Sequence, residues 1–282
     1  MSTLPEYLCP VCQFPLLPPS VSEQRQWSCH NRHGFDASKQ GYLNLLLPQQ
    51  KRSRAPGDTP DMVKARTDFL DTGRYQPLAN ALSQAVAPVS GATQVLLDIG
   101  CGEGYYTTQL AQLDWRQIYG LDISKPAIVA ATRRTSAIHW SVASMRAIPL
   151  AAQSVDAITC VFAYYHAEEV LRVLKPDGRL VLVVAGPDHL LELRQAIYPE
   201  LRPQEADKAL NAALPYFDYL DEQRLDFYLT DLHGDALWNL LQMTPHFWRA
   251  SPAVQTALRA QGFARLRVQV QILTLQPKPV QS

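Results

Sequence analysis

The sequence has 282 residues, enough for one large domain with a small additional module. Its 26 Lys and Arg residues balance 26 Asp and Glu residues, so the overall charge does not indicate a nucleic-acid partner. The longest strongly apolar run, residues 180–185, is far shorter than the ~20 residues that span a membrane. The N-terminus has no signal-peptide pattern, and five cysteines in such a chain are expected to be reduced thiols in the cytoplasm.

Cysteine and histidine are grouped near the N-terminus with the spacing of a metal site. Cys9 and Cys12 are separated by two residues. Cys29 is followed four positions later by His33. These two pairs match the tetrahedral ligand set of Zn²⁺, and because four protein ligands leave no position for water, the ion is expected to be structural. His30 is the competing imidazole, and four free side chains in a loop-rich segment are the alternative interpretation.

Residues 49–58 are polar and basic and contain Pro and Gly near their end, which indicates a linker or an exposed loop. The cations of this segment are Lys51, Arg52 and Arg54. The segment is either a solvated connector or an arm whose cations contact RNA phosphates.

An alternation of apolar strands and helices begins after the linker and predicts an α/β fold. One helix is expected to begin at Asp58 or Thr59 and to end near Gly73, and a second is expected from Pro77 to Val86. Repeated βα steps imply a parallel sheet with helices on both faces. The predicted strands are residues 94–99, 117–121, 138–142, 155–161, 179–185, 223–230 and 264–274, the last as an antiparallel hairpin partner; the predicted helices are 104–113, 125–134 and 166–174, and a turn is predicted at 175–178.

A glycine-rich turn follows the first predicted strand of this unit. Gly100, Gly102 and Gly104 allow the backbone to turn sharply and to approach a ligand closely. Asp98 and Glu103 flank the turn, which suits a ligand that carries positive charge. The pattern resembles the first motif of the Rossmann-like class I methyltransferases that use S-adenosylmethionine, a sulfonium cation. A generic βα turn is the alternative, and the spacing is not that of a dinucleotide-binding fingerprint.

The ends of the next two predicted strands offer further donor contacts. Asp122 is expected to accept hydrogen bonds from the ribose hydroxyls, or else to cap the following helix, which Ser124 would do equally well. Ser144 follows the third strand, where the adenine of the donor is usually held in this class.

The ends of the fourth and fifth strands should border the methyl group that is transferred. Tyr164 and Tyr165 either stack on a base or close the sheet edge. The Asn-Pro-Pro-Tyr-like motif of enzymes that methylate exocyclic amines is absent here, which favours a ring nitrogen as the acceptor. His189 follows the fifth strand beside the cleft, and residues 238–249 either shape the acceptor pocket or form a core helix that ends at Pro245.

Several motifs together look like the bacterial 23S ribosomal RNA guanine-N1 methyltransferases, over nearly the full chain. They are the zinc pattern, Gly-Tyr-Leu-Asn-Leu-Leu at 41–46, the basic linker, Gly-x-Tyr-x-Pro-Leu at 73–78, the glycine turn and Gln-Met-Thr-Pro-x-x-Trp-Arg-Ala at 242–250. The basic linker favours the Gram-negative-like subgroup over the sister subgroup that confers macrolide resistance. The family has Pro where Tyr164 stands, so this chain departs from it at the acceptor pocket.

The resemblance implies methyl transfer from S-adenosylmethionine to N1 of a guanine in a hairpin of 23S rRNA. It implies that Tyr75, the turn at 102–104 and His189 line the donor site. The complete set of predicted donor-binding residues is Tyr75, Asp98, Gly100, Gly102, Glu103, Gly104, Tyr105, Asp122, Ser144 and His189.

The general base is not assigned by the sequence. Asp188, Glu168, Glu169, Tyr164 and Tyr165 are near enough to the expected cleft to be candidates. A small-molecule methyltransferase and a non-catalytic zinc protein that binds RNA are the alternative functions.

The predicted organisation is a zinc-binding RNA-recognition module at 1–47, a basic linker with helices at 48–90 and the methyltransferase domain at 91–282. The expected partner is 23S rRNA, in the cytoplasm and without a membrane, and a homodimer is an open possibility.

Overall fold

The computed structural model describes residues 7–19, 25–51, 53, 55–87, 94–201 and 206–279. Its strands are β1 (Gln26–Ser28), β2 (Gly34–Asp36), β3 (Leu43–Asn44), β4 (Val95–Ile99), β5 (Gln117–Asp122), β6 (His139–Val142), β7 (Val155–Val161), β8 (Leu174–Ala185), β9 (Phe217–Leu232) and β10 (Phe263–Pro277). Its helices are η1 (Pro48–Gln50), α1 (Pro60–Leu70), α2 (Gln76–Val86), α3 (Tyr105–Leu110), α4 (Lys125–Arg134), α5 (Ala167–Val173), α6 (Leu191–Ile197), α7 (Ala206–Ala213), α8 (Gly234–Gln242), η2 (Phe247–Arg249) and α9 (Pro252–Gln261).

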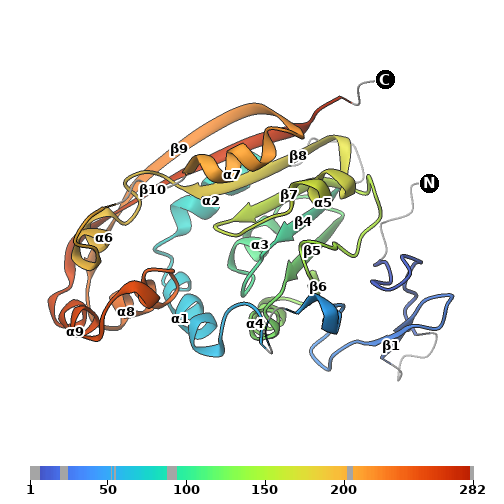
Figure 1. Cartoon of the computed structure of the whole chain (residues 1–282), viewed down its shortest axis with the longest axis horizontal. Helices are drawn as coiled ribbons and strands as arrows, with labels where there is room; N and C mark the ends of the chain where they lie inside the picture. The colour runs from blue at the N-terminus through green and yellow to red at the C-terminus, as the bar shows by residue number, and fades with distance from the viewer. Residues whose placement is uncertain are drawn as a thin grey trace.

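A sheet of eight strands in the order β3-β6-β5-β4-β7-β8-β10-β9 forms the centre of the described chain (Figure 1). The strands from β3 to β8 pair in parallel, whereas β10 runs antiparallel to both β8 and β9. Every residue of β4 is buried, because a central strand of a parallel sheet is covered on both faces. The carboxyl ends of β4, β5 and β7 therefore meet at one edge, where open α/β sheets bind their ligands.

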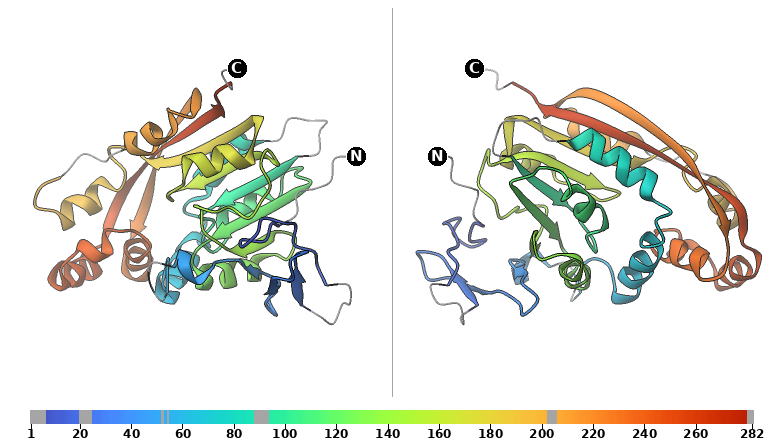
Figure 2. Two further views of the ribbon diagram at one scale, coloured as in Figure 1. Left: turned by 45° about the vertical axis from the view of Figure 1, so that its right-hand side comes forward. Right: turned by 180° about the vertical axis from the view of Figure 1, so that it is seen from behind.

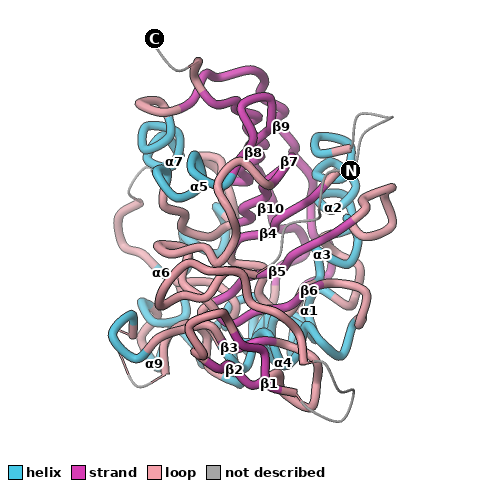
Figure 3. Tube along the Cα trace, turned by 90° about the vertical axis from the view of Figure 1, so that its right-hand side faces the viewer, coloured by secondary structure: helices cyan, strands magenta, loops and turns pink. Residues whose placement is uncertain are grey.

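Helices cover both faces of the sheet (Figure 3). Leu96 points into one core, which includes side chains of α2, α3 and α4, and Leu97 points into the other, which includes side chains of α5 and Phe217 of β9. Adjacent residues of one strand thus contribute to opposite cores, as the pleat requires. Within the described residues, no helix combines the length and the hydrophobicity of a membrane span.

The predicted α/β alternation is confirmed, with three differences in detail. Helix α3 ends at Leu110, three residues earlier than expected. The turn predicted at 175–178 is a bulge inside β8, because Leu174 and Arg179 lie opposite Val155 and Ala157. The last two strands pair antiparallel as expected, but α8, η2 and α9 separate them in sequence, so they are not joined by a hairpin turn.

The N-terminal ribbon, formed by β1 and β2, lies at the β6 end of the sheet, on the opposite side of the molecule from α6, α8 and α9 (Figure 2). Strand β3 joins the central sheet beside β6. The Tyr7 hydroxyl donates to the His139 carbonyl over 2.9 Å, and the Leu8 N–H donates to the Pro149 carbonyl over 2.9 Å. The boundary predicted at residue 47 therefore falls after a strand that already belongs to the central sheet.

Candidate active site and metal centre

The four predicted metal ligands form one cluster in the N-terminal ribbon. Their ligand atoms all lie within 4.8 Å of one another. The Cys12 and Cys29 sulfurs are 3.6 Å apart, and the His33 Nδ1 is 3.6 Å from the Cys9 sulfur and 3.5 Å from the Cys29 sulfur. Sulfur and nitrogen ligands of a tetrahedral zinc are separated by about 3.3–3.8 Å, given bond lengths of about 2.3 and 2.0 Å. The donor set therefore fits a structural Zn²⁺.

Two tight turns present these ligands. In the first, the Gln13 N–H donates to the Cys9 carbonyl over 2.8 Å; in the second, the Arg32 N–H donates to the Cys29 carbonyl over 2.9 Å. Gln13 and Arg32 both adopt a positive φ, which closes each turn behind its pair of ligands. His30, the competing imidazole, lies outside the cluster, with its ring centroid 6.1 Å from that of Phe14.

The glycine turn forms the floor of a large cleft at the carboxyl edge of the sheet. Gly100 and Gly102 line this cleft, and Gly104 begins α3; their φ angles are +69°, +58° and +81°. A Cβ on Gly100 would lie 2.5 Å from the Ala163 Cβ, so the backbones after β4 and β7 approach as closely as glycine permits. Because these glycines have no side chains, the backbone of the turn is accessible from the cleft.

Asp98 and Asp122 lie at the ends of β4 and β5 and support the turn. Asp98 is buried and accepts hydrogen bonds from the Thr107 and Thr159 hydroxyls over 2.5 and 2.8 Å. Burial raises its pKa to about 6. One Asp122 oxygen accepts from the Gly102 N–H over 2.9 Å and the other from the Ser124 N–H over 2.7 Å.

The cap of α4 is Ser124, whose hydroxyl accepts from the Ala127 N–H over 3.2 Å, so Asp122 does not serve as that cap. Each carboxylate oxygen retains a second acceptor site, because each makes one of these hydrogen bonds and can accept two. Asp122 also lines the cleft. The arrangement is compatible with the predicted contact to ribose hydroxyls.

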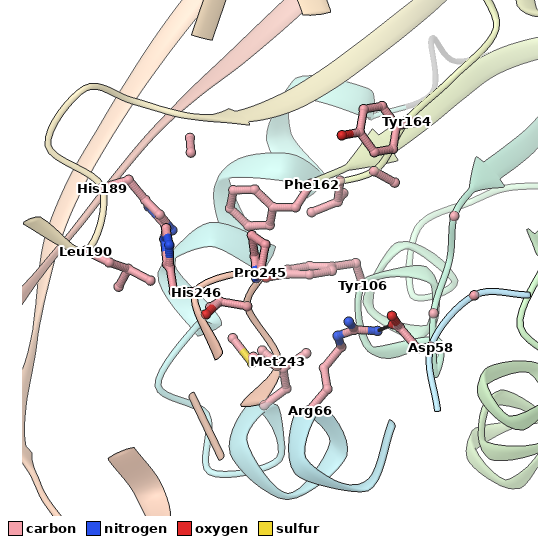
Figure 4. Close-up of a pocket in the computed structure, with 18 of the residues that line it drawn as sticks. Asp58, Arg66, Tyr106, Phe162, Tyr164, His189, Leu190, Met243, Pro245 and His246 are labelled. Carbon is pink, nitrogen blue, oxygen red and sulfur yellow. Dashed lines mark ion pairs between the residues drawn. The ribbon is translucent and has the colours of Figure 1, made fainter. Parts of the chain in front are cut away.

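Arg66 of α1 enters the cleft beside the glycine turn and was not predicted from the sequence. Its guanidinium forms an ion pair of 2.5 Å with Asp58 (Figure 4). Burial raises the pKa of the neighbouring Glu103, although Arg66 opposes that shift. Four carboxyl groups, those of Asp58, Asp98, Glu103 and Asp122, thus lie with Arg66 at this end of the cleft, and the Arg134 guanidinium is 3.7 Å from Glu103. The surplus of negative charge favours a cationic ligand.

The cleft has a volume of about 1240 Å³. Most of the predicted donor-binding residues contribute to it, as does the predicted acceptor residue Tyr164. The predicted residues in its lining are Tyr75, Asp98, Gly100, Gly102, Glu103, Asp122, Tyr164 and His189.

Four of the predicted site residues, Gly104, Tyr105, Ser144 and Tyr165, do not line the cleft. The Tyr105 hydroxyl donates to Gln76, and its neighbour Tyr106 takes the place in the lining, because α3 begins at this point and turns successive side chains in different directions. The Ser144 hydroxyl accepts from the Arg146 N–H over 3.2 Å inside a local turn. Tyr165 is tied to α7, where its hydroxyl donates to the Ala209 carbonyl.

The three carboxylates considered as proton acceptors also lie outside the lining. Asp188 pairs with Arg267 over 2.6 Å, and Glu168 accepts from the Tyr216 hydroxyl over 2.8 Å. Glu169 accepts from Arg172 and from the Ile148 N–H, both over 2.9 Å. Each of these candidate bases is thus engaged in a contact away from the lining of the cleft.

A second group of residues lies at the other end of the cleft, around His189 (Figure 4). Its Nδ1 is 3.0 Å from the Gln269 carbonyl, which can only accept, so Nδ1 carries the proton and Nε2 is an acceptor. Burial lowers the pKa of His189 to about 4, and its ring lies 5.4 Å from that of Phe162. His246, from the segment after α8, and Tyr198, which follows α6, complete this end.

Residues 243–246 and Arg249 line the cleft, so the segment after α8 does contribute to the pocket. Helix α8 ends at Gln242, before Pro245, as the helical interpretation required. Residues 238–242 thus belong to a helix, and the rest of the segment contributes to the lining of the cleft; its role in binding the acceptor stays a prediction. Of the predicted RNA-binding residues, Lys51 is exposed, whereas Arg52 and Arg54 lie outside the described residues.

The sheet is parallel from β3 to β8, with a glycine turn after the central strand β4 and an acid at the end of the neighbouring β5. These features and the attached Cys₃His zinc ribbon define an S-adenosylmethionine-dependent class I methyltransferase with an additional zinc-binding module. Residues 97–182 match the family model described as a methyltransferase domain, and residues 7–54 match the zinc-ribbon model described as RlmA, N-terminal. A 23S rRNA (guanine(748)-N(1))-methyltransferase of Streptomyces fradiae is 33% identical over 250 residues, 86% of each chain. The chain belongs to the family of 23S rRNA guanine-N1 methyltransferases.

Two further relatives agree with this assignment. A putative 23S rRNA (guanine-N(1)-)-methyltransferase of Micromonospora griseorubida is 31% identical over 273 residues, 90% of each chain. Another from Bacillus subtilis is 29% identical over 277 residues, 95% of each chain. The similarity therefore includes the zinc ribbon, the linker and the methyltransferase domain together.

Proposed function

We propose that this chain transfers the methyl group of S-adenosylmethionine to N1 of a guanine in a hairpin of 23S rRNA, in the cytoplasm. The observation that carries the proposal is that one chain contains both a zinc ribbon and a cleft whose charge suits a cationic methyl donor. Its relatives are similar to it over most of their length. A methyltransferase for small molecules would have no need of the ribbon.

The donor is expected to lie along the glycine turn. Its ribose hydroxyls would meet the remaining acceptor sites of Asp122, and its amino-acid part would lie beside Gly100 and Gly102, where no Cβ obstructs it. The sulfonium would then be near the carboxylates of Asp98 and Glu103. Tyr75, whose ring is buried against Phe69 and lines the cleft, would close the donor site on the α2 side.

Methyl transfer requires N1 of guanine to approach the sulfonium carbon in line with the bond that breaks. The N1–C bond forms as the C–S bond breaks, the sulfur keeps the electron pair, and N1 loses its proton. Positioning of the two reactants supplies a large part of the rate enhancement. Since the candidate carboxylates lie outside the cleft, we assign the N1 proton to water.

The zinc ribbon and the basic linker are proposed to hold the RNA. Gly57 and Asp58 connect the linker to the donor site, because the Ser124 hydroxyl donates to the Asp58 carbonyl over 2.8 Å beside Asp122. The cations of the linker would provide affinity for phosphates that does not depend on sequence. The basic linker also supports the Gram-negative-like subgroup, and a homodimer is the assembly to be tested by light scattering.

The test is to incubate the chain with unmodified 23S rRNA and methyl-labelled donor, and to map stops of reverse transcription. A methyl group on guanine N1 blocks Watson–Crick pairing, so a single stop at a guanine is expected. Labelled RNA without such a stop would refute the assignment to N1, and labelling of metabolites without RNA would support the small-molecule alternative.

A further inference from the structure

The end of the cleft that is opposite the glycine turn contains an imidazole with a defined hydrogen-bond partner. His246 Nδ1 lies 2.9 Å from the Tyr198 hydroxyl, and the two rings meet edge to face with centroids 5.7 Å apart. The contact joins the end of α6 to the segment after α8, across 48 positions in sequence. The ring of His246 is thereby fixed relative to the cleft that it lines.

The environment keeps this imidazole neutral. Burial, assisted by the positive charge of Arg194, lowers the pKa of His246 to about 4. A neutral imidazole has one nitrogen that donates and one that accepts. Because a phenol donates a hydrogen bond better than it accepts one, the Tyr198 hydroxyl is expected to donate to Nδ1, which leaves the proton on Nε2. No described residue forms a hydrogen bond with Nε2, so this N–H is available to a ligand.

The acceptor base has a matching requirement. N1 of guanine must face the methyl group, so the protein can hold the base only through the neighbouring O6 and N2 groups. O6 accepts hydrogen bonds, and it gains negative charge when N1 loses its proton, because that charge is shared between N1 and O6. A fixed donor aimed at O6 would stabilise the charge that develops during the reaction.

We propose that His246, held by Tyr198, contacts the acceptor guanine and donates a hydrogen bond from Nε2 to O6. The inference rests on the proposed function and adds to it a residue that selects and activates the base. His246 keeps its proton throughout: the methyl group moves from sulfur to N1, the sulfur keeps the electron pair, and the N1 proton goes to water. Adenine presents an amino group where guanine has O6, so two donors would face each other and adenine would be rejected.

The test uses a hairpin RNA with guanine, 6-thioguanine or hypoxanthine at the target position. Sulfur at position 6 accepts hydrogen bonds poorly, and hypoxanthine lacks only the N2 amino group. His246→Ala should lower kcat/KM for the guanine hairpin by about 10²-fold. The wild-type preference for guanine over 6-thioguanine should fall by about tenfold in this variant, whereas the preference over hypoxanthine should not change.

Conservative variants separate contact from structure. His246→Gln places an amide N–H near the Nε2 position and should recover most of the lost activity. Tyr198→Phe keeps the ring contact and removes the hydroxyl; it should lower kcat more than it raises KM and should reduce the same preference for guanine over 6-thioguanine. His139→Asn, which changes an exposed imidazole outside the cleft, is the control and should leave the preference unchanged.

Three results would overturn the proposal. One is an equal loss with all three bases in His246→Ala, which would mean that the residue has only a structural role. The second is a change in preference for hypoxanthine instead, which would place the contact at N2. The third is an equal loss of donor affinity in calorimetry, which would place His246 in the donor site. Failure of the wild-type chain to methylate guanine N1 would instead refute the proposed function itself.

Discussion

Replacement of Gly100 by alanine should affect stability and donor binding together. Gly100 has a φ of +69°, and this left-handed conformation costs an alanine about 1–2 kcal/mol. The new Cβ would also lie 2.5 Å from the Ala163 Cβ, and relief of such an overlap costs typically about 1–3 kcal/mol more. The free energy of unfolding should therefore fall by about 2–5 kcal/mol, as measured by urea denaturation.

Gly73 provides a matched control, because it has a similar φ of +75° and nothing within 4 Å of its Cβ position. Gly73→Ala should pay only the conformational cost of about 1–2 kcal/mol. It should also leave the donor dissociation constant unchanged in calorimetry, whereas Gly100→Ala should weaken donor binding because the relieved overlap moves the floor of the cleft. Equal losses of stability in the two variants would refute the argument that close approach of two backbones requires Gly100.

Three other predictions concern charge and metal. Asp98 has a pKa of about 6 in the folded chain, against an ordinary value of 3.8, so between these pH values the native state binds more protons than the unfolded state. The stability that the protonated Asp98 contributes is therefore lost as the pH rises from about 4 to 6, and Asp98→Asn should remove this dependence on pH. The variant should gain about 2 kcal/mol relative to wild type between pH 4 and pH 7.5 in denaturation curves, and a flat difference would contradict the burial of an ionised group. Cys12→Ser should lower zinc content and RNA affinity but preserve donor affinity, as emission spectrometry and calorimetry would show; an equal loss of donor affinity would exclude separate modules. Replacement of Lys51, Arg52 and Arg54 by alanine should reduce the slope of log affinity for RNA against log salt by about 2, and an unchanged slope would make the linker a solvated connector.

The sequence was sufficient where the chemistry lies within a few residues. The Cys9–Cys12 pair and the glycine turn that includes Gly100 act through local backbone geometry, so their spacing predicts their structure. Ser124 as a helix cap is equally local. The parallel sheet with helices on both faces also followed from the alternation of strands and helices.

Prediction failed where function depends on partners that are distant in sequence. Neither the Arg66–Asp58 ion pair nor the Tyr198–His246 contact has a local pattern, because each forms only after α1, α6 and α8 have packed around the sheet. The ion pair of the candidate base Asp188 was missed for the same reason. Its partner Arg267 comes from β10, 79 positions later in the chain. The position of Asp188 after the fifth predicted strand gave no indication of that pairing.

The charge of the cleft follows from how the two ends are built. Strand ends and the turn supply Asp98, Glu103 and Asp122 to one end, where Arg66 and Arg134 are the neighbouring cations. S-adenosylmethionine has a net charge of about +1 from its sulfonium, amino and carboxylate groups, whereas the thioether product has none, so this end attracts the donor more strongly than the product. The other end holds a neutral His246 near a cationic Arg194, which suits a guanine that is losing a proton. The donor end of the cleft thus carries negative charge, whereas the acceptor end has no surplus of carboxylates. Methyl transfer removes the positive charge of the sulfonium from the donor end.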